Sequence, residues 1–262
     1  MDWDDGLQSV NKSLINTFTT MNEIERTKTG TDKSVVRDMF NSIAPHYDLL
    51  NHLLTLGIDR CWRRKAIRRI TLPSSPKIAD IACGTADMSV ALYRRFKPCT
   101  IVGLDLSEQM LVRGKAKIEK LGLQHSISFR QENCEATSLS SDSVDLVTVG
   151  FGIRNFNNPQ KGLSEFYRVL KPNGQLLILE FSKPKYKLIR WVYNFYFFKI
   201  LPLIGRCISS HPAAYTYLPN SVENFPYGDD FVDMMRTAGF DECTHQSLTF
   251  GIATIYIARK NG

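Results

Sequence analysis

Two acidic residues and one glycine carry the clearest chemical signal in this sequence. Asp80 lies at the end of an apolar, strand-like run, Gly84 follows it closely, and Asp105 ends the next such run 21 residues after Gly84. That spacing matches the position from which a carboxylate accepts hydrogen bonds from both hydroxyls of a ribose. A dinucleotide site would add glycines in the pattern G-x-G-x-x-G to let backbone amides reach a pyrophosphate, and here only Gly84 is present.

The charge of Asp80 narrows the ligand further, because a carboxylate beside the glycine loop opposes a phosphate but suits a cation or an ammonium group. The combination describes a nucleoside without phosphates. S-adenosylmethionine has that chemistry, since it joins adenosine to a sulfonium cation and an amino-acid tail. The alternative is that Gly84 is a turn residue and Asp105 a charge at the start of a helix. Cys83 has no histidine in the neighbouring segments to activate it and is expected to be a packed thiol.

The elements that must position these residues follow from the hydrophobic pattern. Strand-like runs, each followed by a helical stripe or a turn, occupy residues 77–82, 100–106, 127–129, 144–149, 175–180 and 252–258. Alternating strands and helices with short joints predict an α/β fold with a doubly wound, mostly parallel sheet. Ligands bind such sheets beyond the carboxyl ends of the strands, which directs attention to residues 80–87, 105–110, 132–136 and 150–156.

Helix boundaries are also readable at several points. Ser107 is expected to cap a helix that ends at Gly122. The apolar stripe that ends at Leu170 predicts a helix closed by a turn over 171–174. A second stripe, from Trp62 to Ile70, predicts a helix in the segment before the first strand.

Length and composition indicate one domain with extensions. The chain has 262 residues, 43% hydrophobic and 23% charged, values that argue against a disordered or disulfide-dense protein. Residues 1–35 are predicted to be a polar N-terminal arm and 36–262 a single domain, with 36–72 as a helical lid and 183–228 as a substrate-side insertion. The six cysteines lack metal-ligand spacing, so we expect free thiols and no metal site. The acidic N-terminus lacks an export pattern, so a cytoplasmic location is expected.

Net charge is +7, and much of it lies in one short segment. The cluster comprises Arg60, Arg63, Arg64, Lys65, Arg68 and Arg69. Such a cluster is either a solvated helix face or a contact for nucleic acid or anionic lipid, and charge alone does not decide between them.

Several ordered motifs resemble a known family. Residues 80–87, Asp105 and 145–149 look like the motifs of class I S-adenosylmethionine-dependent methyltransferases. Further stretches are similar to the ubiquinone/menaquinone C-methyltransferases, the UbiE family, over roughly residues 36–260: 47–51 continuing to Trp62, 151–155, 168–174, 180–182 and 215–218. The resemblance implies a seven-stranded, Rossmann-like sheet, S-adenosyl-L-methionine as cofactor and a prenylated quinol as substrate. Demethylmenaquinol is the first expectation, and a benzoquinol precursor of ubiquinone is the alternative.

The cofactor contacts that the resemblance implies are Thr85, Asp105, Asn133 and Cys134, to which we add Asp80, Gly84 and Gly150. Two departures from the family pattern fall here. Ala86 stands where the family usually has glycine, and we expect alanine to be tolerated as part of a helix start. Gly150 stands where the family usually has serine, which puts one cofactor hydrogen bond in doubt.

Catalysis on a quinol ring requires stabilisation of a phenolate. Arg154, after the fourth strand, is expected to supply a permanent positive charge near the developing oxyanion, unless it forms a structural ion pair instead. Asn155 is expected to orient a water with it, and Tyr47 to hydrogen-bond the ring oxygen. Asp48 and His46 are candidate proton acceptors, although a histidine there could equally serve packing.

The stretch from Trp191 to Leu203 is unusually aromatic and aliphatic. It is consistent with a core helix, with a groove for an isoprenoid tail, or with shallow peripheral contact with the inner face of a membrane.

Self-association is left open. The rivals are a nucleic-acid methyltransferase, a nicotinamide-dependent reductase and a non-catalytic partner. The first is disfavoured because 150–153 reads Gly-Phe-Gly-Ile instead of an Asn/Asp-Pro-Pro-aromatic motif, so no nucleic-acid partner is expected.

Overall fold

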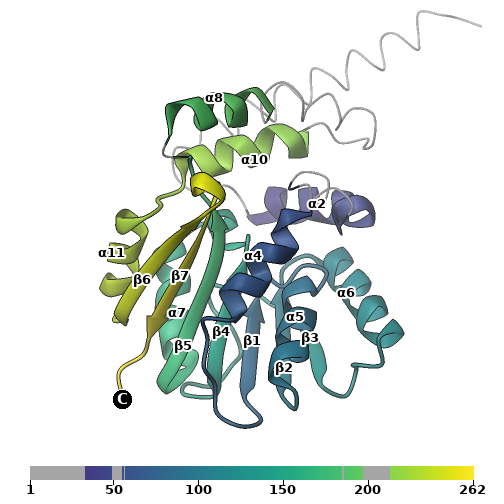
Figure 1. Ribbon diagram of the computed structural model, residues 1–262. Coiled ribbons are helices and arrows are strands. Elements are labelled where there is room, and N and C mark those ends of the chain that lie inside the picture. Colours follow the sequence, from purple (N-terminus) through teal and green to yellow (C-terminus); the bar gives the residue numbers. More distant parts are fainter. Residues whose placement is uncertain (1–32, 49–54, 56, 185, 197–212) are drawn as a thin grey trace, which may run out of the picture.

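The computed structural model describes residues 33–48, 55, 57–184, 186–196 and 213–262 (Figure 1). Its centre is a seven-stranded sheet with the order β3-β2-β1-β4-β5-β7-β6. The first five strands pair in parallel, and β7 pairs antiparallel with both β5 and β6. The strands are β1 (Lys77–Ile81), β2 (Thr100–Asp105), β3 (Ile127–Gln131), β4 (Val144–Gly150), β5 (Leu170–Phe181), β6 (Asp241–Leu248) and β7 (Ala253–Arg259). The predicted doubly wound, mostly parallel sheet is confirmed.

Helices cover both faces of this sheet. One face packs against α4 (Ile58–Ile67), α5 (Asp87–Phe96) and α6 (Glu108–Lys120), and the other against α7 (Pro159–Val169) and α11 (Asp229–Thr237). Successive residues of β4 therefore enter different cores: Leu146 packs with Trp62 of α4, and Val147 with Phe166 of α7. Burial on both faces explains why the central strands read as continuous apolar runs.

The remaining elements lie over the carboxyl edge of the parallel strands (Figure 1). They are α2 (Lys33–Ile43), the short helix η1 (Ala44–His46), α8 (Lys187–Phe195) and α10 (Ala213–Asn224). Ile43 and Ala44 are buried against Met110 of α6, so the helical lead-in is packed on the sheet domain. α2 begins three residues before the expected boundary at 35/36, and the rest of the predicted arm, 1–32, lies outside the described residues.

The predicted helix boundaries agree with the structure where a neighbouring side chain fixes them. Ser107 caps α6 by accepting a hydrogen bond from the Met110 amide at 3.3 Å, as predicted. The prediction for Leu170 is wrong, because it has extended backbone angles and begins β5. Residues 171–174 are part of β5 but interrupt its pairing with β4, which shifts from Val144–Leu170 to Leu146–Gln175, and Asn173 has φ of 64°. Leu170 is fully buried, so its apolar side chain fits a helical stripe and a sheet equally well. Similarly, α4 ends at Ile67, and Ile70 is buried without being helical.

One strand is not predicted by the pattern. β6 pairs only with β7, so it forms an edge of the sheet, and its sequence from Asp241 to Leu248 is mostly polar. An edge strand with little burial has no apolar run to reveal it.

Among the described residues, no helix is long and apolar enough to cross a membrane. The five cysteines in the described part of the chain are free thiols, and Cys207 lies outside that part.

Candidate active site

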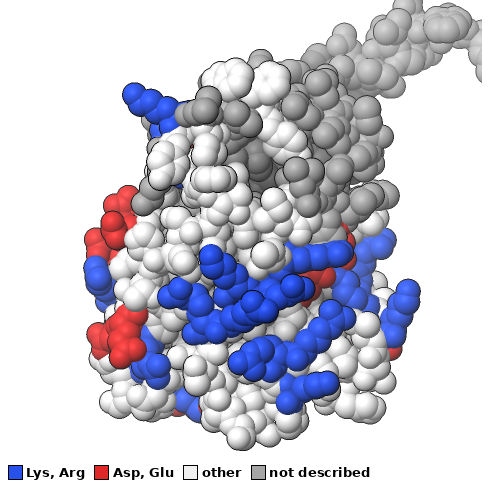
Figure 2. Space-filling model, in the orientation of Figure 1, with Lys and Arg blue, Asp and Glu red and all other residues white. Residues whose placement is uncertain are grey.

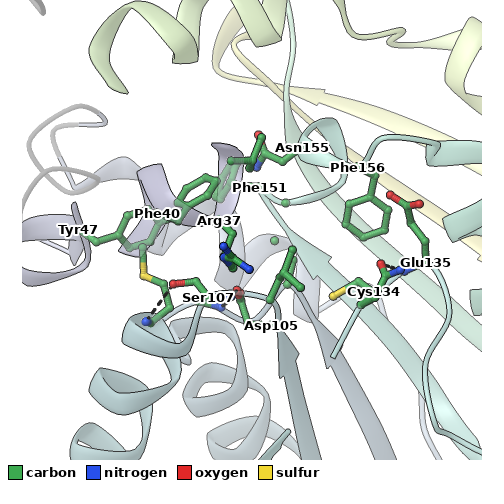
Figure 3. A pocket seen from close by; sticks show the side chains of 18 residues that line it. Arg37, Phe40, Tyr47, Asp105, Ser107, Cys134, Glu135, Phe151, Asn155 and Phe156 are labelled. Carbon is green, nitrogen blue, oxygen red and sulfur yellow. Dashed lines mark hydrogen bonds between the residues drawn. The ribbon is translucent and has the colours of Figure 1, made fainter. Parts of the chain in front are cut away.

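A pocket opens at the carboxyl ends of β1, β2 and β4, beneath α2 and η1 (Figure 3). Asp105 and Ser107 lie on its floor, Phe40 and Tyr47 approach from the helical lead-in, and Cys134 lies on the opposite side. The other lining residues are Val36, Arg37, Ala82, Gly84, Leu106, Met110, Asn133, Glu135, Gly150, Phe151, Gly152, Asn155 and Phe156. Carboxylate, amide and aromatic groups thus converge at the end of the sheet where ligands bind in such folds.

Asp105 is held with its carboxylate fixed. Its Oδ2 accepts a hydrogen bond from the Gly84 amide at 2.8 Å, and its Oδ1 accepts one from the Ser107 amide at 2.8 Å. Burial raises the pKa of Asp105, although these amides favour the ionised form. Each carboxylate oxygen can accept two hydrogen bonds, so both oxygens keep capacity for a vicinal diol. Gly84 has φ of +53°, a conformation that suits glycine, and this turn directs its amide at Asp105.

Asp80 lies deeper, at the end of β1. It is fully buried, its Oδ2 accepts a hydrogen bond from the Ser89 hydroxyl, and its Oδ1 has no partner among the described residues. Burial raises the pKa of Asp80 to about 7, against the opposing influence of Ser89 and Arg63. Asp80 lines a smaller cavity that shares Tyr47 and Gly84 with the pocket. A buried carboxylate oxygen without a partner beside a cavity is a place for an ammonium group.

Ala86 is strained, which corrects the expectation that alanine fits here as part of a helix start. It is the N-cap of α5 and has φ of 70° and ψ of 23°, a left-handed conformation, while its side chain is fully buried. An L-residue with a Cβ is disfavoured in this region by about 1–2 kcal/mol. Glycine, the usual family residue, would avoid that strain.

We therefore expect Ala86→Gly to raise the free energy of unfolding by up to about 1 kcal/mol, because relief of strain exceeds the roughly 0.8 kcal/mol lost with a buried methyl group. Urea denaturation measures the change. The matched control is Ala116→Gly on the exposed side of α6, where the same substitution should lower stability by about 1 kcal/mol. Equal losses in the two variants would show that Ala86 is not strained.

Asp48 fastens the lead-in to the sheet domain. It accepts a hydrogen bond from the Thr85 hydroxyl and forms an ion pair with Lys117 of α6 at 2.7 Å. Lys117 also pairs with Asp87 at 2.7 Å. Asp48 lines neither cavity, whereas Thr85 lines the smaller one. The structure thus places Asp48 beside the glycine loop in an ion-pair network.

The other predicted residue of the lead-in is closer to the ligand space. Tyr47 lines both cavities, and its ring lies 3.7 Å from the position that a Cβ at Gly84 would take. The side chain of His46 lies outside the described residues.

Arg154 forms a buried ion pair. Its Nη1 lies 2.7 Å from Glu180 Oε1, and the two side chains are only 7% and 1% exposed. Nη1 also donates to the Phe151 carbonyl, Nε donates to Ser221 at 3.3 Å, and the guanidinium lies over the Phe181 ring. Burial opposes the charge, but Glu180 together with Tyr47 and Tyr217 outweighs burial, and the pKa of Arg154 is raised. Arg154 does not line the pocket, and its Nη2 makes no hydrogen bond with the described residues.

Asn155 does line the pocket, and a residue of the insertion holds it. Its Oδ1 accepts a hydrogen bond from the Tyr217 hydroxyl of α10 at 3.0 Å. Burial raises the pKa of Tyr217, partly offset by Arg154. Sequence reasoning missed Tyr217 as a site residue, although its stretch, 215–218, was among those that resemble the family. It also missed Arg37, which Figure 3 shows reaching from α2 toward Asp105.

The remaining predicted residues lie around the pocket. Asn133 Oδ1 accepts a hydrogen bond from the Glu135 amide at 3.1 Å, and buried Cys134 adjoins it. A Cβ at Gly150 would lie 3.2 Å from Met88 Cε, so a serine would require a small shift of that flexible side chain. Burial raises the pKa of the Cys83 thiol well above its usual range, so Cys83 is not a thiolate nucleophile.

The sheet order and the pocket at its carboxyl edge define the class I methyltransferase architecture. Among solved structures, Haemonchus contortus phosphoethanolamine N-methyltransferase 2, solved with S-adenosyl-L-methionine, superposes with a TM-score of 0.58. It is 13% identical, and the match covers 76% of this chain and 52% of that one. At this identity the likeness concerns the fold.

Sequence relatives are much closer. A Geobacter sulfurreducens ubiquinone/menaquinone biosynthesis C-methyltransferase UbiE is 44% identical over 226 residues, covering 86% of this chain and 88% of the relative. A Bacteroides fragilis demethylmenaquinone methyltransferase is 41% identical over 231 residues, covering 88% and 94%. Residues 26–260 match the ubiE/COQ5 methyltransferase family. The chain belongs to this family and is a methyltransferase.

Proposed function

We propose that the protein transfers a methyl group from S-adenosyl-L-methionine to a ring carbon of a prenylated quinol. The observation that carries the proposal is one continuous pocket, in a member of this family, that joins Asp105 and Gly84 to the aromatic side chains of Tyr47 and Phe151 and to Asn155. Demethylmenaquinol is the substrate that we favour, because several relatives are named demethylmenaquinone methyltransferase. A benzoquinol precursor of ubiquinone is the alternative, since other relatives carry both quinones in their names.

The residues present fit the cofactor. Asp105 offers two fixed carboxylate oxygens to a ribose, and the unpartnered Oδ1 of Asp80 suits the ammonium of the methionine tail. Asn133 and Cys134 line the wall beyond Asp105, where an adenine ring would lie. Thr85 and Gly150 border the smaller cavity beside Asp80. The seventh residue that the sequence suggested, Gly84, holds the Asp105 carboxylate through its amide.

The reaction requires orientation and a proton acceptor. When bound, the cofactor would supply a sulfonium methyl group. A carbon–carbon bond forms as the sulfur–methyl bond breaks, and the ring carbon then gives its proton to water. Tyr47 and Phe151 would hold a planar quinol ring against the glycine loop. Asn155, held by Tyr217, would orient a water that accepts the phenolic proton. Asp48 contributes by keeping the lead-in closed through Thr85 and Lys117.

Arg154 lies behind the residues that line the pocket and acts on it through its charge. Its charge influences the hydroxyls of Tyr47 and Tyr217, and its Nη2 retains donors that the ion pair with Glu180 does not use. A fixed guanidinium at this depth favours negative charge on a nearby ring oxygen without reorganising. Arg154 cannot serve as the base, because it does not release its proton in proteins.

Cofactor affinity should depend on pH through Asp80. With a pKa of about 7, Asp80 is mostly protonated at pH 6 and mostly ionised at pH 7.5. Only the carboxylate attracts the ammonium, and an α-amino group with a pKa of about 7.7–8.0 is itself partly neutral at pH 7.5, so affinity should rise roughly five- to sixfold over this interval. Titration calorimetry with S-adenosylmethionine measures the rise. Asp80→Asn should bind weakly with a flat profile, and an unchanged profile would remove Asp80 from the ammonium site.

The insertion presents aromatic side chains to solvent. Tyr186, Trp191 and Phe195 are 65%, 66% and 51% exposed, and the last two rings stack at 6.0 Å between centroids. For these residues the core-helix explanation is wrong, while 197–203 lies outside the described residues. Amphipathic aromatic side chains suit the boundary of a lipid bilayer. We infer that α8 makes shallow, peripheral contact with the membrane that holds a prenylated substrate.

A transfer assay tests the proposal. The purified protein is incubated with methyl-labelled S-adenosylmethionine and, separately, demethylmenaquinol, a demethylated ubiquinol precursor and bulk tRNA. Label should enter a quinol and not tRNA, with demethylmenaquinol the better acceptor. Labelling of tRNA alone would replace the proposal with the nucleic-acid rival.

A further inference from the structure

Four residues of the basic cluster, Arg60, Arg63, Arg64 and Arg68, line a surface groove that the proposed chemistry does not use. The groove lies between α4 and α5, has a volume of about 710 Å³, and is bordered by Arg60, Arg64, Arg68, Arg94 and Arg95. Figure 2 shows lysine and arginine side chains gathered across this face, over the helices labelled α4 and α5 in Figure 1. We call these five residues the groove arginines.

The groove arginines have no acidic partners within the described part of the chain. The acidic residue that lines the groove, Asp87, is already bonded to Lys117 at 2.7 Å and to Arg63 at 3.2 Å. The five side chains are exposed, and three of them repeat every fourth residue: Arg60 and Arg64 in α4 and Arg68 at its C-cap. Like charges at that spacing destabilise a helix, so the row is not explained by stability. A negatively charged ligand would neutralise it.

The shape and chemistry of the groove point to phosphate groups carried by lipid. Guanidinium groups bind phosphate in bidentate fashion. The non-polar lining is aliphatic, from Ile67, Val90, Ala91 and Leu121. Among the described residues no aromatic side chain lines the groove, so a single-stranded nucleic acid finds no stacking surface there, and a concave surface does not enter a major groove. Clusters of four to eight cations on an amphipathic helix bind anionic lipid head groups.

We propose that the groove arginines bind the phosphate head groups of an anionic membrane. The proposal rests on the proposed function in one respect, because it is the prenylated substrate that brings the enzyme to a membrane. Stable peripheral attachment needs two signals, such as an apolar anchor and a polybasic patch. The exposed aromatic residues of α8 supply the first, and the groove supplies the second.

Vesicle co-sedimentation of the full chain tests this proposal. The vesicles contain phosphatidylcholine alone or an equal mixture with phosphatidylglycerol. The variant Arg60→Gln/Arg64→Gln/Arg68→Gln should bind the mixed vesicles roughly hundredfold more weakly than wild type, from about one tenfold step or less per charge removed. The matched control, Lys97→Gln/Arg113→Gln/Lys161→Gln, removes the same charge from exposed positions outside the groove and should bind as wild type.

Four results would overturn the inference. The first is absence of wild-type binding to the mixed vesicles, and the second is equal weakening of vesicle binding in both variants. The third is release of the protein from the mixed vesicles by millimolar inorganic phosphate, at a concentration that does not weaken general charge attraction. The fourth is binding of tRNA or polyglutamate, but not of vesicles, that depends on the groove arginines. An assay of methyl transfer to a short-chain quinol in detergent requires no membrane, so it tests the proposed function separately from this inference. The groove variant should retain that activity, whereas an inactive wild type that still binds vesicles would contradict only the proposed function.

Discussion

Replacing Arg154 with alanine should lower both turnover and stability. Glu180 would remain buried without its partner, which typically lowers the free energy of unfolding by about 3–5 kcal/mol. Turnover with a quinol should fall at least about a hundredfold, because a preorganised positive charge is lost where a phenolate forms. Affinity for S-adenosylmethionine should change little, since Arg154 does not line the pocket. Chemical denaturation, calorimetry and steady-state rates at low temperature measure the three quantities.

A second variant separates chemistry from structure. Arg154→Met/Glu180→Gln removes both charges. The glutamine oxygen still accepts the hydrogen bond that the Phe181 amide gives to residue 180 at 2.9 Å, while the longer bond from the residue 154 amide, at 3.3 Å, is lost. Replacing a buried ion pair by uncharged groups of similar size is often neutral for stability. We expect stability within about 1–2 kcal/mol of wild type, the cost of the lost backbone hydrogen bond, with turnover still depressed about a hundredfold. Recovery of turnover in this double variant would show that Arg154 serves only as a structural ion pair.

Asp105→Asn should weaken S-adenosylmethionine binding about a hundredfold. Two hydrogen bonds from ribose hydroxyls to a charged carboxylate contribute at least about 1.5 kcal/mol each, and the neutral amide cannot reproduce both. The fold should lose about 1–3 kcal/mol of stability, because the amide nitrogen of asparagine cannot accept the hydrogen bond that the Gly84 or the Ser107 amide gives to Asp105. Turnover at saturating cofactor should stay within a few-fold of wild type.

The matched control for Asp105 is Asp145, a second carboxylate of the same sheet. Asp145 lies near the amino end of β4, accepts a hydrogen bond from the Lys77 amide at 2.8 Å and pairs with Lys171 at 2.8 Å. Asp145→Asn should leave cofactor affinity unchanged in calorimetry. Equal affinities for the two variants would refute the assignment of Asp105 to the ribose.

The site residues that could be predicted from the sequence are those whose positions follow from the pattern of neighbouring residues. Asp80 and Asp105 end apolar strands, and parallel strands bring their carboxyl ends to one edge, so spacing alone placed these carboxylates together. The Ser107 cap and the periodicity of α6 were equally local. The seven-stranded order and the substrate class depended instead on the family resemblance, since the pattern does not reveal the polar edge strand β6.

The parts that sequence reasoning did not reach depend on contacts between distant segments. Glu180 meets Arg154 because β4 and β5 are neighbours, although 26 residues separate them. Tyr217 reaches Asn155 from an insertion whose position no periodicity specifies. The strain at Ala86 follows from a backbone turn, and alanine itself carries no signal of a positive φ.

The most direct test of this account is a crystal structure of the protein with S-adenosylmethionine and a short-chain quinol analogue. We predict both ribose hydroxyls within hydrogen-bonding distance of Asp105, the ammonium against Asp80, and the quinol ring beside Tyr47 and Asn155 with its reactive carbon facing the methyl group. A nucleoside bound away from Asp105, or a quinol outside the pocket that Asn155 and Tyr47 line, would contradict the account.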